Sequence, residues 1–288
     1  MTQNTRQRLA LGIHLSAAGG VSKAIDAAIE LDIDSLQIFT RNNNRWQTKP
    51  IDSKEIDRFH ERHQQWGPER QIFSHGSYLI NMASPDEELW AKSVEAFKDE
   101  YQRADSLALT GLVMHPGAHV GSGVDGGLER VAKGILETIN SFPEGKTRIL
   151  LENTAGQGST LGRSFEELST LLHHIDAPTR VGICLDSCHL LAAGYDLTTA
   201  TTYQETMAQF DSLLGVETLF CWHLNDSRGK LGSHLDRHEN IGDGEVGLEG
   251  FRQILNDARF DGISKILETP KKDDMDPVNL SRLRELAL

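Results

Sequence analysis

Short apolar runs alternate with segments of helical periodicity along the whole chain. The run at 11–16, LGIHLS, has the length and apolar character of a buried strand. The segment that follows, 21–31, places apolar residues on one helical face, which predicts an amphipathic helix. The same succession recurs until eight strand-like runs have passed, at 11–16, 35–40, 71–78, 112–117, 148–156, 181–189, 219–226 and 265–270.

Local signals mark where several of the intervening helices begin. Ser84 precedes Pro85 and two acidic residues, which predicts a capping serine, proline at the first helical position and acids in the first turn. Ser164 and Glu167 have the spacing of a capping box ahead of another apolar face. Helices are therefore expected over 21–31, 53–66, a long stretch after Ser84, 128–139, 168–175, 199–214 and 249–257.

Eight strand–helix units in succession predict a parallel sheet that is covered by helices. No Pro- or Ser-rich linker and no block of like charge interrupts them, so nothing indicates a domain boundary. Closed barrels of this type commonly occupy about 250 residues as one unit, and the chain has 288. We predict the α/β class and a TIM (β/α)8 barrel, one domain spanning 1–288.

Six of the strand-like runs end in a side chain that divalent metals bind. The C-terminal ends of barrel strands meet at one face, where active sites of such barrels form. Two local pairs in the loops, Asp186 with His189 and Asp236 with His238, would add donors at the same face. We therefore predict a metal site in the barrel mouth, with nine ligands: His75, His115, Glu152, Asp186, His189, His223, Asp236, His238 and Glu268.

The ligand types narrow the choice of metal and of chemistry. Five imidazoles and four carboxylates without a thiolate favour Zn²⁺ or Mn²⁺ over Mg²⁺ and over softer metals. Nine ligands suit two or three ions if one carboxylate bridges. Without cations, we expect the crowded carboxylates to repel one another and their pKa values to rise. Three bound ions would make the mouth positive, which suits a phosphate and its in-line displacement.

The composition of the chain limits which partners it can bind and in which cellular compartment it is expected. Apolar residues make up 38% and charged residues 25% of the chain, as in ordinary soluble proteins. A formal net charge of −13 argues against a broad basic surface for polyanions, although bound metal ions would not be counted in it. Cys184, Cys188 and Cys221 lie in or beside apolar runs, so we expect buried free thiols in a reducing compartment. No apolar stretch has signal-peptide or membrane-spanning length, which predicts a cytoplasmic protein without a membrane partner.

Other motifs carry less weight. The glycine patterns at 121–126 and 242–247 match a dinucleotide fingerprint, but neither lies in a tight turn directly after a strand. We interpret both as flexible barrel loops and expect no nucleotide cofactor. His14 ends the first strand and is either a tenth site residue or a hydrogen-bonded histidine under the cluster. His173 and His174 fall on a helix and are expected at its solvated surface.

Eight segments together resemble the apurinic/apyrimidinic endonuclease IV family of DNA-repair enzymes, in order and across nearly the whole chain. This resemblance implies a TIM barrel with three zinc ions in its mouth. It also implies hydrolysis of the phosphodiester 5′ to an abasic site in duplex DNA, leaving 3′-hydroxyl and 5′-deoxyribose phosphate ends. The segments are HLSAAGG (14–20), SHGSYLIN (74–81), HPGAH (115–119), LENTAGQGSTLG (151–162), LDSCHLLAAGYD (185–196), HLNDS (223–227), DRHENIGDGEVG (236–247) and ILETP (266–270).

Carried over by motif, the resemblance distributes the nine ligands over three ions. It implies one zinc on His75, His115 and Glu152. A second is implied on Glu152, Asp186, His223 and Glu268, with Glu152 bridging. The third is implied on His189, Asp236 and His238, and Mn²⁺ is an alternative at one or more sites.

The expected chemistry follows from these ion positions. A hydroxide between the first two ions would attack the scissile phosphorus, because zinc-bound water has a pKa of about 7. We expect Glu152, Asp186 and Glu268 to be catalytic through this arrangement. A 3′-repair phosphodiesterase side activity is also expected.

The resemblance further implies side chains that enter the duplex from loops beside the mouth. An abasic nucleotide leaves the helix at the lowest cost, because its base is already missing. Tyr78 matches one such DNA-binding position. The other falls in TRNNNRW (40–46), where family members typically carry arginine at the position of Asn44. Either Arg45 replaces it by a shift of the loop or Asn44 itself serves, and Trp46 either contacts DNA or only packs.

Two rival functions remain open from the sequence. A metal-dependent sugar isomerase or epimerase on a similar barrel would also gather His, Glu and Asp at strand ends, but with fewer ligands and a small closed pocket. The pair Asp236 and His238 favours phosphoester chemistry instead. A catalytically silent metal- or DNA-binding relative is the second rival, although no liganding position of the motifs is lost. We expect a monomer that acts on abasic duplex DNA and is nucleoid-associated when on its substrate.

Overall fold

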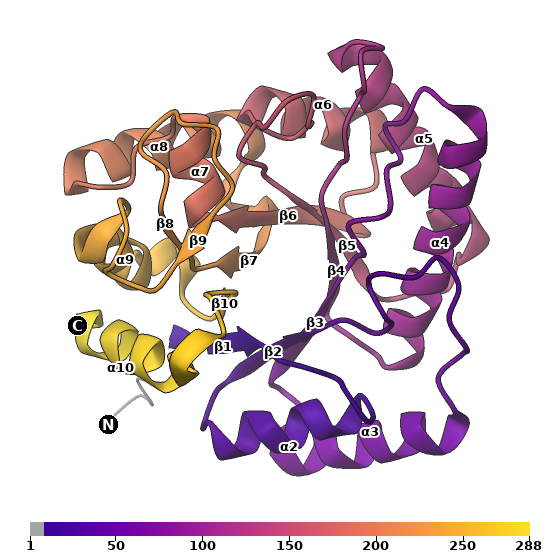
Figure 1. Ribbon diagram of the computed structural model, residues 1–288, viewed down its shortest axis with the longest axis horizontal. Coiled ribbons are helices and arrows are strands. Elements are labelled where there is room, and N and C mark those ends of the chain that lie inside the picture. Colours follow the sequence, from indigo (N-terminus) through magenta and orange to yellow (C-terminus); the bar gives the residue numbers. More distant parts are fainter. Residues whose placement is uncertain (1–8) are drawn as a thin grey trace.

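Eight parallel strands close into a barrel in the computed structural model, which describes residues 9–288 (Figure 1). Around the barrel, the order is β1, β10, β7, β6, β5, β4, β3 and β2, and every neighbouring pair is parallel. This confirms the predicted α/β class and TIM barrel. The strands are β1 (Leu11–His14), β2 (Ser35–Ile38), β3 (Gln71–His75), β4 (Gly111–Met114), β5 (Arg148–Glu152), β6 (Val181–Asp186), β7 (Leu219–His223) and β10 (Ser264–Leu267).

Helices surround the barrel on its outside (Figure 1). Their apolar faces and the outward faces of the strands form one large buried cluster, which is why each helix repeats apolar residues on one side. The helices are α2 (Ser22–Glu30), α3 (Ser53–Trp66), α4 (Glu87–Ser106), α5 (Val124–Ser141), α6 (Phe165–Ile175), α7 (Ser187–Ala193), α8 (Ala200–Leu214), α9 (Gly247–Asn256) and α10 (Asp276–Leu286), with short 3₁₀ turns η1 (Val216–Thr218), η2 (Ala258–Phe260) and η3 (Lys272–Asp274).

A second, smaller cluster of buried residues fills the inside of the barrel. It takes one residue from each of six strands and is separate from the large outer cluster. Side chains two positions apart on a strand point to the same face. The residue two positions later on each strand therefore also points inward, one layer closer to the C-terminal face. The six inner residues are Phe73, Val113, Leu150, Cys184, Cys221 and Ile266.

Two predicted helix starts were only partly right. Helix α4 begins at Glu87, and its cap is Asp86, whose carboxylate accepts the Leu89 N–H at 2.8 Å. The capping role expected of Ser84 is wrong, because its hydroxyl instead accepts the Asp86 N–H at 3.2 Å and shapes the turn before the helix. Pro85 accordingly lies ahead of the helix rather than at its first position.

At the start of α6, only one of the two hydrogen bonds of the predicted capping box is formed. The Ser164 hydroxyl accepts the Glu167 N–H at 3.3 Å, as expected of an N-cap. The Glu167 carboxylate does not return a bond to the Ser164 backbone; it accepts the Gly162 N–H at 2.7 Å. The acid therefore anchors the preceding loop, which belongs to the mouth of the barrel.

Two helices and one hairpin were not predicted. Helix α7 follows β6 directly, the hairpin of β8 (Asp226–Ser227) and β9 (His238–Glu239) lies inside the long loop after β7, and α10 follows β10. None of the helices in the described part combines the length and apolar character that crossing a bilayer would require. Residues 1–8, part of the segment in which no signal sequence was expected, lie outside the described residues.

Candidate metal centre

Six candidate ligands lie in one layer of the mouth, on the inner faces of the strands. Each stands two residues after a member of the inner apolar cluster, so period-two alternation points it inward. Four are the last residues of their strands, and the other two follow β4 and β10 directly. The six, in chain order, are His75, His115, Glu152, Asp186, His223 and Glu268.

Glu152 lies at the centre of these side chains and is fully buried. Its Oε2 is 2.9 Å from Nε2 of His75 and 3.0 Å from Nε2 of His115. Its Oε1 is 2.9 Å from Nδ1 of His223 and 3.5 Å from Nδ1 of His189. One carboxylate therefore faces imidazoles on both of its oxygens, the arrangement that a bridging ligand requires.

A second group lies beside it, built from α7 and the β8–β9 hairpin. Oδ1 of Asp236 is 3.3 Å from Nε2 of His189 and 3.7 Å from Nε2 of His238. One donor atom from each of the three residues lies within 4.8 Å of the others. Both Nε2 atoms are buried and have no hydrogen-bond partner among the described residues. Two buried imidazole nitrogens without partners, facing one carboxylate, fit a cation between them.

Backbone carbonyls fix which imidazole nitrogen is free. Nδ1 of His75 lies 2.8 Å from the Gly76 carbonyl, and Nδ1 of His189 lies 2.9 Å from the Asn153 carbonyl. His238 repeats the pattern, since its Nδ1 lies 3.1 Å from the Glu268 carbonyl. A carbonyl only accepts, so each Nδ1 carries a hydrogen, and each Nε2 is the nitrogen that can offer a lone pair to a metal once it has lost any proton of its own. Metal-binding histidines are oriented in this way by a partner on the other nitrogen.

Three buried amides, absent from the predicted site, form hydrogen bonds to the residues that carry its carboxylates. Nε2 of Gln37 donates to Oε1 of Glu268 at 2.5 Å, and its Oε1 accepts from Nε2 of His223 at 2.9 Å. Asn225 donates to Oδ2 of Asp186 at 2.6 Å and accepts the Glu268 N–H at 2.8 Å.

Asn153 completes this set of amides. Its side-chain oxygen accepts the backbone N–H of Asp186 at 2.6 Å. The only signal in the sequence was that a polar amide interrupts or directly follows an apolar run, as Gln37 does in SLQIFT.

The electrostatics of the carboxylates differ from the expectation. Burial alone would raise the pKa of Glu152, but its charge interactions and hydrogen bonds with His223 and His115 hold it well below its usual range. The pKa of Glu268 is lowered in the same way, chiefly by His223. The predicted rise of these carboxyl pKa values is wrong, because neighbouring histidines supply the positive charge. The pKa of His189 rises instead: burial lowers it, but Asp186, Asp236 and Glu152 raise it to about 10.

The remaining motifs have structural explanations. His14 is hydrogen-bonded, since its Nδ1 is 2.9 Å from Oε1 of Glu268 and 3.0 Å from Gln37. His173 and His174 are exposed in the last turn of α6, as expected. The glycine loop at 242–247 is not a free loop, because its backbone N–H groups donate to the buried carboxylate of Asp226. A protein carboxylate thus occupies the position that a phosphate would take in a nucleotide fingerprint.

Comparison with known proteins identifies the family. The family model described as a xylose isomerase-like TIM barrel matches residues 25–286. The "Probable endonuclease 4" of Trichlorobacter lovleyi is 48% identical over 96% of this chain and 99% of its own length. That of Chloroflexus aurantiacus is 46% identical over 96% of this chain and 97% of its own. The chain belongs to the endonuclease IV family.

Solved structures agree with this assignment. The crystal structure of endonuclease IV from Thermus thermophilus has a TM-score of 0.86 and 34% identity, covering 96% of this chain and 98% of that one. A D-tagatose 3-epimerase-like protein has a TM-score of 0.72 but only 22% identity, over 96% of both chains. The second likeness shows the fold alone, whereas the first lies within the endonuclease IV family.

Two loops of this endonuclease IV family member border the ligand cluster. Tyr78, after β3, is 66% exposed and lines a cavity of about 420 Å³ that also holds six of the nine candidate ligands. Asn44, after β2, is exposed and lines an adjoining hollow of about 1070 Å³. The two spaces share His238 and Glu268 on their walls. Tyr78 and Asn44 therefore face space that is continuous with the site.

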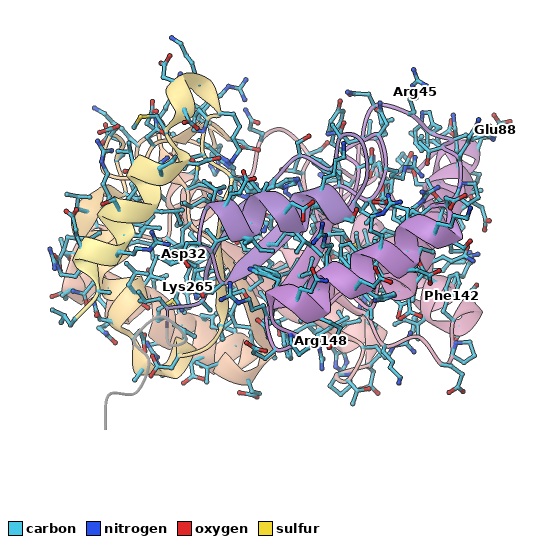
Figure 2. All side chains as sticks on the ribbon, turned by 90° about the horizontal axis from the view of Figure 1, so that it is seen from below. Asp32, Arg45, Glu88, Phe142, Arg148 and Lys265 are labelled. Carbon is cyan, nitrogen blue, oxygen red and sulfur yellow. The ribbon has the colours of Figure 1, made fainter. Side chains whose placement is uncertain are left out.

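The other two residues of the loop after β2 lie differently. Arg45 is exposed at the outer edge of the molecule and lines neither hollow (Figure 2). The Trp46 ring packs under the Lys92 ammonium, 4.2 Å from the ring centroid, on α4. Arg41 is buried and donates to the backbone carbonyls of Arg45 and Trp46. Trp46 thus packs against α4, its contact with DNA stays a prediction, and the buried guanidinium holds the loop.

Proposed function

We propose that this protein incises duplex DNA on the 5′ side of abasic sites, leaving 3′-hydroxyl and 5′-deoxyribose phosphate ends, with three zinc ions bound in its mouth. Relatives named endonuclease 4 match 96% of the chain and support an endonuclease of this type. The observation that carries the proposal is Glu152, whose two oxygens face four imidazoles at the base of the mouth. We propose that it acts as a monomer inside the cell, with a 3′-repair phosphodiesterase side activity.

The donors fit three ions. Glu152 would bridge an ion on His75 and His115 to an ion on Asp186, His223 and Glu268. His189, Asp236 and His238 would hold the third, and their close approach supports this set. When bound, such ions neutralise phosphate charge and make water available as hydroxide near neutral pH, which is the chemistry that hydrolysis requires. The absence of a thiolate from the nine favours zinc, with manganese as an alternative.

The chain's own residues would set the geometry of this centre. Glu152, Asp186 and His223 are fully buried, so their positions are fixed by packing, and we propose the carboxylates of Glu152, Asp186 and Glu268 as catalytic. Gln37 and Asn225 orient these carboxylates by hydrogen bonds. His115 and Asp236 are about two-fifths exposed and lie at the rim, where a substrate phosphate would arrive. The site is therefore fixed at its base and open at its rim.

Substrate selection would depend on the two bordering loops. A nucleotide reaches a recessed site only after it leaves the duplex, and this costs least where the base is missing. The exposed ring of Tyr78 lies on the wall of the cavity, where it can fill the gap in the duplex. Asn44 faces the adjoining hollow, so we propose it, rather than Arg45, as the second DNA-contacting residue. Local positive charge from bound ions would compensate for the net charge of −13.

The test combines metal analysis with incision of an oligonucleotide duplex that contains one abasic site. We expect three zinc ions per chain and a single cut 5′ to the site, with no cut in the undamaged duplex. Glu152→Gln should abolish incision, whereas Glu129→Gln, an exposed glutamate on α5, should leave it unchanged. A metal-free active protein, or near-native turnover by Glu152→Gln, would refute the proposal. Turnover of a ketose with no incision would favour the epimerase alternative.

A further inference from the structure

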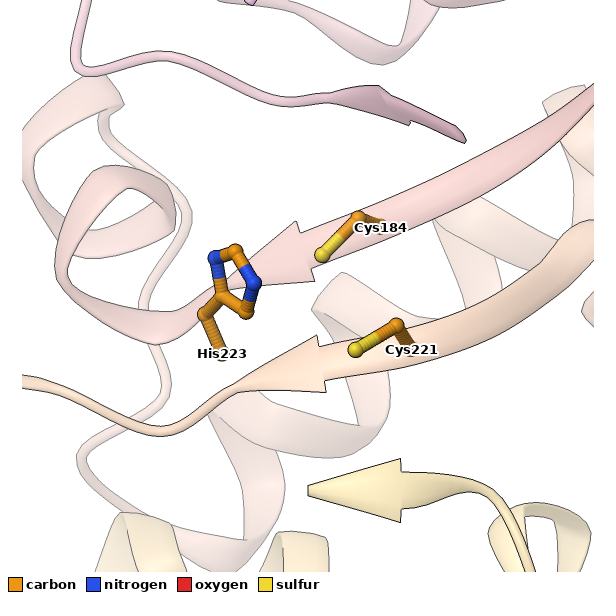
Figure 3. A group of neighbouring side chains, drawn as sticks. All are labelled: Cys184, Cys221 and His223. Atoms are coloured by element: carbon orange, nitrogen blue, oxygen red, sulfur yellow. The ribbon is translucent and has the colours of Figure 1, made fainter. Parts of the chain in front are cut away.

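Two cysteines and one histidine form a second cluster of metal-binding groups just below the site. Cys184 on β6 and Cys221 on β7 are register partners on neighbouring parallel strands, and both belong to the inner apolar layer. His223 follows Cys221 by two residues and so points to the same side. Figure 3 shows the two thiols side by side with the His223 ring next to them. All three residues are fully buried.

The separation of the donor atoms suits one ion. Both sulfur atoms and one ring nitrogen of His223 lie within 4.8 Å of one another. A zinc–sulfur bond is about 2.3 Å long, so two thiolates on one ion stand up to about 4.6 Å apart. Cations larger than zinc form longer bonds and span a wider gap. The cluster therefore needs little rearrangement to close on an ion.

The charge of the three ligands and the apolar side chains around them determine which class of cation can bind. The remaining members of the layer are apolar: Phe73, Val113, Leu150 and Ile266. Burying a net charge among such side chains is costly. Two thiolates and a divalent cation form a neutral unit, and a neutral imidazole adds a third ligand without charge. Thiolates prefer soft cations, in contrast to the imidazole and carboxylate donors of the mouth.

We propose that Cys184, Cys221 and His223 form a second site, for one soft, thiophilic divalent cation such as Cd²⁺. Each thiol gives up its proton to solvent as its sulfur binds the ion, so two protons are released per cation. The site lies directly beneath the proposed zinc ligands and shares one of them, because His223 also faces Glu152 at 2.9 Å. Both ring nitrogens of His223 already have partners, Nδ1 in Glu152 and Nε2 in Gln37, each at 2.9 Å. A cation bound below would take one of these nitrogens from its partner and so disturb the position of the ring against Glu152.

Inhibition of incision follows from the shared histidine, and this consequence rests on the proposed function. Binding itself does not, because it has its own optical signal. The test adds Cd²⁺ to the zinc-loaded protein and records the ultraviolet thiolate-to-cadmium charge-transfer absorption. The nine proposed zinc ligands include no thiolate, so cadmium that replaces zinc in the mouth gives no such band.

The decisive variant is Cys188→Ala, because the chain has three cysteines and this protein keeps only Cys184 and Cys221. Cys188 lies on α7, near Asp186 and His238, and is the rival thiol. We expect the band in wild type and in Cys188→Ala, saturating at one cadmium per chain, and its loss in Cys184→Ala and Cys221→Ala. Two results would overturn the proposal. One is absence of the band in Cys188→Ala, and the other is its survival in the double variant that carries both Cys184→Ala and Cys221→Ala.

The activity arm uses the same proteins. Cadmium should inhibit incision by wild type and by Cys188→Ala at least tenfold more strongly than incision by Cys184→Ala. Circular dichroism establishes that each variant is folded before comparison. Equal inhibition of all variants would show that cadmium acts in the mouth and would refute the role of His223. If none of the proteins cuts DNA, the proposed function fails while the absorption band still reports on binding.

Discussion

The Glu100 carboxylate accepts the backbone N–H of Ser77 at 3.0 Å, and this bond joins α4 to the loop that carries Tyr78. The Ser77 hydroxyl in turn donates to the Asn43 carbonyl at 2.6 Å. Nε of the buried Arg41 lies 3.6 Å from the same Glu100 oxygen. One buried carboxyl group therefore connects the two loops that border the mouth.

Glu100 should make stability depend on pH. Burial raises its pKa to about 7, although the Ser77 N–H and Arg41 favour the ionised form. The folded state thus keeps a proton that the unfolded chain releases near pH 4.5, so this contribution is complete below that pH and is lost as the pH rises through about 7. Glu100→Gln keeps the accepting oxygen but cannot ionise.

We therefore expect the stability of wild type relative to Glu100→Gln to fall by up to about 3 kcal/mol between pH 5 and pH 8. Urea unfolding of both proteins across this range measures the difference. A difference that stays constant with pH would show that Glu100 is ionised throughout.

Asn44 gives a prediction about DNA affinity. A cationic side chain that reaches a phosphate releases a counterion and steepens the salt dependence of binding. Asn44→Arg should therefore raise the slope of log K against log salt by about 1 in magnitude for an abasic duplex. Fluorescence anisotropy at several salt concentrations measures it.

The matched control is Asn140→Arg, which makes the same change in charge. Asn140 is exposed near the end of α5, and the helices of such barrels end at the face opposite to the mouth. We expect its slope to equal that of wild type. Identical slopes for all three proteins would mean that position 44 does not approach the phosphates.

The part of the site that could be predicted from the sequence is the part that follows from strand periodicity. His75, Glu152 and His223 end strands whose inner faces alternate with period two, so their convergence follows from the pattern once the barrel is assumed. The distances between ligands from different strands could not be predicted, because they depend on barrel closure. Even the sign of the carboxyl pKa shifts was wrong, since it depends on which histidines lie beside Glu152.

Elements that tertiary contacts determine were also missed. Helix α7 is one short segment capped by Asp186, whose side chain accepts the His189 N–H at 2.8 Å. The hairpin of β8 and β9 is two residues per strand, too short for any alternation to be visible. Gln37 stands in an apolar run, where its partners come from β7 and from the loop after β10, far away in the sequence.

Gln37 should act through metal affinity. It contacts both Glu268 and His223, and partners that orient metal ligands typically contribute 10–100-fold to affinity. Gln37→Met should weaken zinc retention by about this factor, measured by competition with a chelator. Gln71→Met is the matched control, because Gln71 lies at the N-terminal end of β3 and bonds Ser264 there. Equal retention by both variants would remove Gln37 from the site's support.

Asp226 should hold the loop that carries the third ligand group. Its carboxylate accepts the N–H groups of Gly242, Gly244 and Val246 at 2.8, 3.1 and 2.8 Å. Asp226→Ala would leave these donors without a partner, at a cost of at least about 3 kcal/mol. Urea unfolding measures this loss, and elemental analysis should show one zinc fewer per chain. Full zinc content in a folded variant would show that Asp236 and His238 are positioned independently of this carboxylate.

Zinc uptake by the metal-free protein should release protons. Burial lowers the pKa of His189 and His223, but neighbouring carboxylates raise the first to about 10 and the second well above its usual value. Both imidazoles therefore carry a proton at pH 7, and each must lose it to bind metal. We expect at least two protons per chain at pH 7, and fewer as pH approaches 10. Calorimetry in buffers of different ionisation enthalpy counts them, and uptake without proton release would show that these histidines are already neutral.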